Sequence, residues 1–123
     1  MKFALDSAGS HYTIKRYSPE GITINDTDYT RSLIVSADTL LTDWSPQTLE
    51  DLKPESFAPI LELKPTILLL GVGERHQFPA PALLQNLYRN NIGVEIMTTA
   101  AACRTFNVLV AEGRSVVAAL LRG

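Results

Sequence analysis

The sequence has few of the residues that most chemical sites need. Its 123 residues include one cysteine and two histidines, and these three residues lie far apart. A single cysteine excludes a disulfide within the chain, so a reducing compartment is the simplest environment. Because the cysteine and histidines also lack the spacing of metal ligands, we expect no metal site and no cofactor.

The sequence also lacks a basic run and a long apolar segment. Its 11 Lys and Arg residues are scattered and the formal net charge is −2, so we expect no nucleic-acid partner. The apolar runs are far shorter than the ~20 residues that a spanning helix needs, which predicts no direct membrane insertion. The first residues show no apolar core of a signal peptide, so the expected location is cytoplasmic.

An apolar segment, Ile67 to Leu70, organises the chain and is followed by a loop that contains two glycines. Four consecutive apolar residues without polar alternation are typical of a strand that is buried on both faces, in the middle of an α/β sheet. In α/β folds the loop after such a strand usually carries the site. We therefore expect any functional site at positions 71 to 79.

The N-terminal third shows alternating apolar and polar residues, which predict an antiparallel β-meander. We expect strands at 11–17, 22–24 and 29–36, and residues 1–9 as a loosely held arm. Between residues 38 and 64, prolines predict short helices, one of which has Ser45 as N-cap and Pro46 at its first helical position.

The second half alternates strands and helices after the segment that ends at Leu70. Helices are expected at 80–90 and 100–111, the second capped by Thr98 and Thr99 and ended by Gly113, with strands at 94–97 and 115–121. Crossovers of this length require parallel strands. The predicted fold class is α/β: a three-layer single domain over residues 1–123, with an N-terminal antiparallel β-meander joined to a βαβαβ unit in a mixed central sheet.

Two short runs near the end of the chain resemble a known family. They are CRTFNVL at residues 103–109, in the last predicted helix, and EGR at residues 112–114, directly after it. Together with GVG at 71–73 and VE at 94–95, these runs resemble a family of small single-domain α/β proteins. Many members are bacterial proteins of unknown function, and the family includes a human mitochondrial complex I assembly factor and an adipogenesis-associated protein. The likeness extends over residues 10 to 121.

The resemblance implies a compact three-layer α/β domain and an assembly or regulatory role through protein contacts. It assigns no catalytic residue. The sequence does not begin with a presequence like that of the mitochondrial factor, so we expect a bacterial cytoplasmic relative.

Two glycines, Gly71 and Gly73, form part of a dinucleotide fingerprint, and Glu95 stands where a ribose-binding acid would be. The third glycine position is His76, and the next helix begins too late for its N–H groups to face the glycines. Glycines that turn a buried strand outward are therefore the favoured interpretation.

Three neighbouring loop residues, Glu74, Arg75 and His76, offer an acid, a fixed cation and a titratable imidazole. This set is compatible with general acid–base chemistry, but consecutive charged loop residues are more often simply solvated. Cys103 and His76 form a conceivable nucleophile and base, yet small and apolar neighbours favour Cys103 as a buried filler.

The polar residues of the family-like segment include Arg104, Asn107, Glu112 and Arg114. Their favoured role is structural, since polar side chains near a helix end can satisfy loop backbone groups. A recognition surface formed with the loop at 71–79 is the alternative.

The leading functional hypothesis is a protein-binding domain without catalytic activity, possessing a contact surface at residues 71–79, Arg104 and Arg114. By resemblance it is an assembly factor for a respiratory or membrane complex. The alternative is a domain or enzyme that binds an anionic metabolite or nucleotide through Glu74, His76 and Glu95. The sequence specifies neither the partner protein nor the oligomeric state.

Overall fold

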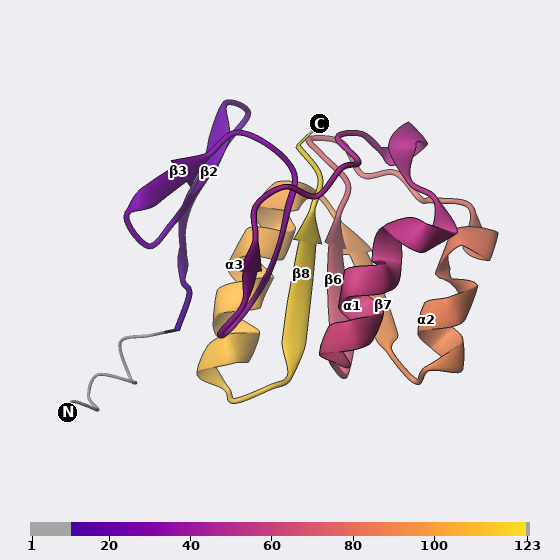
Figure 1. The fold of residues 1–123 in the computed structure, drawn as a ribbon. Helices are drawn as coiled ribbons and strands as arrows, with labels where there is room; N and C mark the ends of the chain where they lie inside the picture. Colours follow the sequence, from indigo (N-terminus) through magenta and orange to yellow (C-terminus); the bar gives the residue numbers. More distant parts are fainter. Residues whose placement is uncertain (1–10, 123) are drawn as a thin grey trace.

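The centre of the domain is a five-stranded sheet with the strand order β5-β4-β8-β6-β7 (Figure 1). This computed structural model describes residues 11–122, so the arm expected at 1–9 lies outside the described residues. Strands β6, β7 and β8 run parallel, whereas β4 is antiparallel to both β8 and β5. The sheet is therefore mixed, as predicted. Its strands are β4 (Leu33–Ser36), β5 (Leu40–Leu41), β6 (Ile67–Gly71), β7 (Gly93–Met97) and β8 (Val116–Leu120).

The organising segment forms β6, which lies inside the sheet between β8 and β7. Leu68, Leu69 and Leu70 are fully buried, which confirms the prediction of a strand covered on both faces. The middle position of the five belongs to β8, however, whose small residues Ala118 and Ala119 are also fully buried. The parallel strands β6, β7 and β8 end at one edge of the sheet.

Helices cover both faces of this sheet and produce the three predicted layers (Figure 1). On one face, α1 (Ala58–Leu63) and α2 (Gln85–Arg89) bury Ile60 and Leu87 against β6 and β8. On the other face, α3 (Thr99–Ala111) buries Phe106 in a separate core. Successive side chains of each strand point alternately into one core and then the other, as the pleat of a strand requires.

A second sheet lies beside α3 and consists of β1 (Ile14–Ser18), β2 (Gly21–Ile24) and β3 (Thr27–Tyr29). These strands are antiparallel, and the reversal between β2 and β3 contains Asn25 in the left-handed region, at φ 53°. The expected β-meander is therefore present. Ile22 and Ile24 point into the same core as Phe106, so the small sheet extends the layer that α3 forms.

The single strand expected at 29–36 is wrong, because β3 and β4 belong to different sheets. The chain crosses between the sheets at Ser32, which is fully buried. There the N–H of Ser32 donates to the side-chain oxygen of Gln47, and its hydroxyl accepts the N–H of Arg122. The carbonyl of Ser32 accepts the backbone N–H of Trp44, so residues outside a strand ladder satisfy Ser32.

The segment between β5 and β6, two strands of the central sheet, contains short helices, as the prolines predicted. They are the 3-10 turns η2 (Leu49–Asp51) and η3 (Pro54–Phe57), followed by α1. The expected helix start at Ser45 and Pro46 is wrong. The carboxylate of Asp51 instead accepts the N–H groups of Gln47 and Thr48, at 3.1 and 3.2 Å, and Thr48 becomes the N-cap of η2.

The remaining elements lie close to their predicted bounds. The helix expected at 80–90 is a 3-10 turn, η4 (Pro81–Leu84), continued by α2. The hydroxyl of Thr98 accepts the N–H of Ala101 at the start of α3, which confirms the predicted cap. Gly113 follows α3 with a φ of 79°, a left-handed value typical of glycine after a helix.

We expect Gly71→Ala to lower the free energy of unfolding by about 1–3 kcal/mol, the usual cost of overpacking. A Cβ on Gly71 would lie 2.9 Å from the Cα of Thr99, a backbone atom that cannot move alone. Gly93→Ala is the matched control, because a Cβ at that strand residue would lie 3.6 Å from the nearest atom. Urea unfolding of both variants measures the difference, and equal stability would contradict this account of Gly71.

Candidate functional site

The loop after β6 is held by the buried side chain of Thr99, the first residue of α3. The hydroxyl of Thr99 accepts the N–H of Gly73 at 2.9 Å and donates to the carbonyl of Leu121 at 3.0 Å. The N–H of Thr99 donates to the carbonyl of Gly73 at 2.9 Å. Gly73 has a φ of 105°, which disfavours any residue other than glycine. Its N–H, which a phosphate would need, is therefore occupied within the fold.

The polar residues that follow Gly73 extend into solvent. Glu74, Arg75 and His76 are exposed, and the ring of His76 packs edge-on against Phe78 with the ring centroids 4.7 Å apart. Glu95 is exposed in the middle of β7, where it pairs with Leu69 rather than with the loop. Five pockets among residues 11–122 are lined neither by Glu95 nor by residues 71–79. The small-molecule alternative at this loop stays a prediction.

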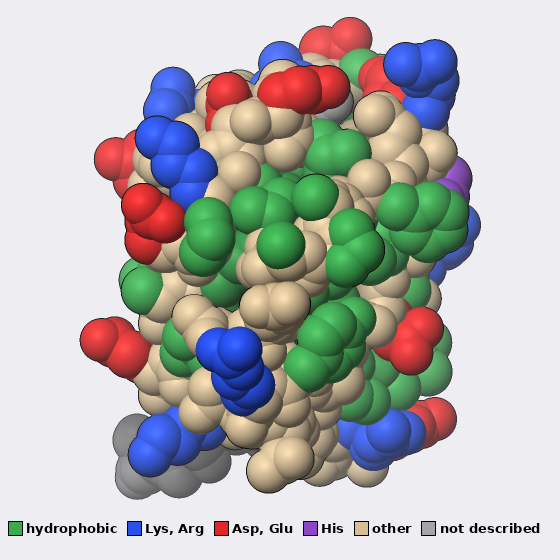
Figure 2. All heavy atoms as spheres, turned by 90° about the vertical axis from the view of Figure 1, so that its right-hand side faces the viewer, with side chains coloured by type: hydrophobic (Ala, Val, Ile, Leu, Met, Phe, Trp, Pro, Cys, Tyr) green, Lys and Arg blue, Asp and Glu red, His purple; other side chains and the backbone are tan. Residues whose placement is uncertain are grey.

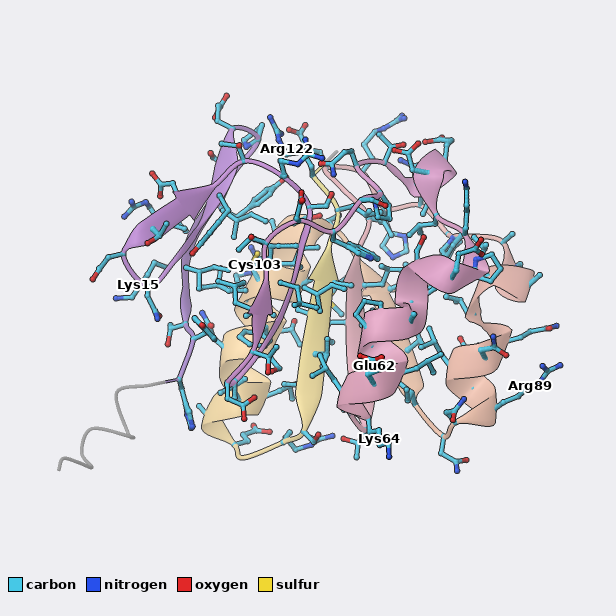
Figure 3. The ribbon with its side chains drawn as sticks, viewed as in Figure 1. Lys15, Glu62, Lys64, Arg89, Cys103 and Arg122 are labelled. Atoms are coloured by element: carbon cyan, nitrogen blue, oxygen red, sulfur yellow. The ribbon has the colours of Figure 1, made fainter. Side chains whose placement is uncertain are left out.

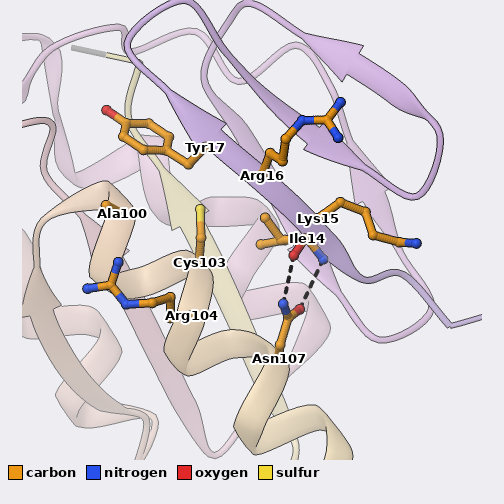
Figure 4. A pocket seen from close by; sticks show the side chains of 8 residues that line it. All are labelled: Ile14, Lys15, Arg16, Tyr17, Ala100, Cys103, Arg104 and Asn107. Atoms are coloured by element: carbon orange, nitrogen blue, oxygen red, sulfur yellow. Dashed lines mark hydrogen bonds between the residues drawn. The ribbon is translucent and has the colours of Figure 1, made fainter.

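Asn107 connects α3 to the small sheet through the backbone of Ile14 (Figure 4). The N–H of Ile14 donates to Oδ1 of Asn107 at 3.0 Å, and Nδ2 of Asn107 donates to the carbonyl of Ile14 at 2.7 Å. The amide thus satisfies both backbone groups of one strand residue. This geometry supports the structural interpretation of Asn107.

The other polar residues of the family-like segment, Arg104, Glu112 and Arg114, lie near opposite ends of α3. Arg104 lies in the second turn, near the start of α3, and is exposed. Glu112 and Arg114 follow the other end, where their side chains form a 3.8 Å ion pair with about half of each side chain exposed. A helix of 13 residues is about 20 Å long, so Arg114 and Arg104 lie near opposite ends of α3 and do not form one surface patch.

Cys103 is a buried thiol that points between α3 and the small sheet (Figure 3). Only 4% of the residue is exposed, and burial raises the pKa of the thiol to about 12. The thiol is therefore neutral near pH 7 and a poor nucleophile. The prediction that Cys103 is a buried filler is confirmed, and exposed His76 provides no base for it.

A groove between β1 and α3 was not predicted from the sequence. It has a volume of about 240 Å³ and lies between strand residues 14–17 and one side of α3 (Figure 4). Tyr17 contributes a hydroxyl that is buried and has no hydrogen-bond partner within residues 11–122. The two walls are about 90 residues apart in the sequence, so no local pattern could have indicated the groove. Its lining residues are Ile14, Lys15, Arg16, Tyr17, Ala100, Cys103, Arg104 and Asn107.

Residues 14–121 match the model of a family described as "Protein of unknown function (DUF498/DUF598)". The chain belongs to this family. The match covers the small sheet, the central sheet and all of the helices, and it confirms the resemblance inferred from the segment at 103–114.

Two relatives are named NADH dehydrogenase [ubiquinone] 1 alpha subcomplex assembly factor 3. The Xenopus tropicalis protein is 34% identical over 110 residues, which are 88% of this chain and 60% of that protein. The Danio rerio protein is 35% identical over 117 residues, 94% of this chain and 66% of that protein. This chain therefore spans less than two thirds of the length of these relatives.

A protein of Xanthomonas campestris, solved by NMR, has the same fold with a TM-score of 0.86. It is 35% identical, and the alignment covers 100% of this chain and 93% of that one. In residues 11–122, no helix combines the length and the apolar character that crossing a membrane requires.

We expect Asn107→Ala to lower the free energy of unfolding by about 1–3 kcal/mol, because both backbone groups of Ile14 lose their partner. Gln85→Ala, at an exposed position of α2, is the control and should change stability by less than about 0.5 kcal/mol. Urea unfolding gives both values. A loss below 0.5 kcal/mol for Asn107→Ala would show that the connection to β1 adds little.

The raised pKa of the Cys103 thiol makes stability fall at alkaline pH. Its contribution is fully present below the unfolded-state pKa of about 8.5 and is lost as the pH rises towards 12. Between pH 8.5 and 10, the protein should lose about 1.5 kcal/mol more than Cys103→Ala, which has no thiol to titrate. Parallel pH profiles of urea unfolding for the two proteins would contradict the raised pKa.

Proposed function

We propose that this chain is a protein-binding domain without catalytic activity that helps to assemble a respiratory or membrane complex in the bacterial cytoplasm. The observation that carries the proposal is the Danio rerio relative, named as an assembly factor and aligned over 94% of this chain. The alignment includes nearly the whole domain, which supports a role carried by the shared fold. The proposed partner is another protein.

The proposed contact surface consists of residues 74–79 together with Arg104. Phe78 is 73% exposed, which is unusual for a large aromatic side chain and typical of an interface anchor. Arg75 and His76 place positive and titratable groups next to it. Figure 2 faces the α2 side of the molecule and shows hydrophobic side chains gathered there, with charged side chains mainly around them. That face does not include Arg104, which lies on α3 at the opposite face of the sheet, so the exposed Phe78 beside Arg75 and His76 is what supports contact with a protein.

Deletion of the gene in its source organism should reduce the amount of assembled NADH dehydrogenase complex. Native gels of membranes and rates of NADH oxidation measure this effect, and the unaltered gene should restore both. An unchanged amount of the complex after deletion would contradict the proposed function. Fractionation of the same cells tests the cytoplasmic location.

Variants of the contact surface should fail to restore assembly. Phe78→Ser removes an anchor worth about 2 kcal/mol, which corresponds to about 30-fold weaker binding. The double charge reversal Arg75→Glu and Arg104→Glu tests the charged part. Val108→Ser is the matched control for Phe78, since Val108 is 55% exposed on α3, and Arg114→Glu is the control for the arginines. If all four variants restore assembly equally, the surface is elsewhere.

A further inference from the structure

The groove between β1 and α3 carries more positive charge than the composition of the chain predicts. Lys15, Arg16 and Arg104 line it, and no acidic residue does, although the whole chain has a net charge of −2. Within residues 11–122 none of these three cations forms a salt bridge. The guanidinium of Arg104, on the α3 wall, therefore has no counter-charge within these residues, and an anion in the groove would supply one.

One end of the groove combines a hydrogen-bond donor with a fixed cation. Figure 4 shows the ring of Tyr17 and the guanidinium of Arg104 on the same side, with Ala100 between them. Burial and the negative charge of Glu74 raise the pKa of the Tyr17 hydroxyl, which is therefore a protonated donor at neutral pH. Because this hydroxyl has no partner within the described residues, a bound acceptor would satisfy it.

The remaining walls suit an anion as well. Ala100 is in the first turn of the 13-residue helix α3, where the helix dipole favours negative charge. The neutral thiol of Cys103 and the side chain of Ile14 form an apolar floor. Asn107 holds β1 against α3, so the two walls are already positioned before any ligand arrives.

The size and rim of the groove limit what it can accept. Its volume of about 240 Å³ is below the usual range for drug-sized ligands, and it fits a molecule the size of an amino acid or a small phosphate ester. The head groups of Lys15 and Arg16 extend away from α3 in Figure 4. Both are exposed and flexible, so they can turn over a ligand at the open side.

We propose that this groove binds the carboxylate or phosphate of a small anionic molecule, held between the Tyr17 hydroxyl and the Arg104 guanidinium at the start of α3. Lys15 and Arg16 cover its open side. The proposal goes beyond the assembly role, since it concerns a different ligand class and is tested on the purified protein alone. Glu74 opposes binding, because its negative charge acts on Tyr17.

The test is an NMR titration of the isotope-labelled chain with inorganic phosphate and, separately, with acetate, at constant ionic strength set by sodium chloride. We expect saturable shifts of the Ala100, Cys103 and Arg104 amide signals. Saturation by phosphate alone identifies a phosphate site, and saturation by acetate alone identifies a carboxylate site. Shifts that do not saturate with either anion would overturn the proposal.

Variants separate this site from general charge attraction. Arg104→Gln should raise Kd about tenfold and Tyr17→Phe about fivefold, whereas Glu74→Gln should lower Kd about threefold. Arg89→Gln is the matched control, because Arg89 is exposed on α2, away from Lys15 and Cys103 (Figure 3), and should leave Kd unchanged. Without anions, Tyr17→Phe should not lower stability in urea, since it removes an unpaired hydroxyl. An equal Kd for Arg104→Gln and the unaltered protein would overturn the proposal.

Discussion

The arrangement of the domain depends on one buried hydroxyl, that of Thr99. It accepts from Gly73 after β6 and donates to Leu121 after β8, while the backbone of Thr99 follows β7 and begins α3. The side chain of Thr99 thus joins the ends of β6 and β8, and its backbone connects the end of β7 to the start of the helix that covers all three strands. Because the group is fully buried, loss of either partner would leave a polar atom unpaired in the core. Close packing around it also requires a glycine at position 71.

Much of the fold could be predicted because its signals are local. The run from Ile67 to Leu70 indicates a buried strand by itself, and Thr98 and Gly113 mark the two ends of α3. The errors arose where distant residues decide the structure. Ser32 leaves its strand because Gln47 and Arg122 supply its hydrogen bonds, and the latter lies 90 residues away. A strand pattern cannot reveal such a partner.

In the candidate site, too, local features could be predicted from the sequence and contacts between distant residues could not. The sequence predicts the position of the loop at 71–79 after a buried strand, and the charged residues of this loop are exposed, as is usual for consecutive charged loop residues. What the sequence could not show is the groove, because its walls come from β1 and α3 and meet only in the folded chain. The sequence favours a structural role for Asn107, as a polar residue that satisfies backbone groups. It does not indicate that the partner is Ile14, which lies 93 residues away.

The small sheet has a consequence for how members of this fold can diverge. Among residues 11–122 it shares no strand pairing with the central sheet, and side chains such as Asn107 and Arg122 join it to the rest. Substitutions and length changes in β1 to β3 therefore leave the hydrogen-bonded ladder of the central sheet intact. Since β1 forms one wall of the groove, this peripheral module can be remodelled to alter what the groove accepts while the scaffold stays constant.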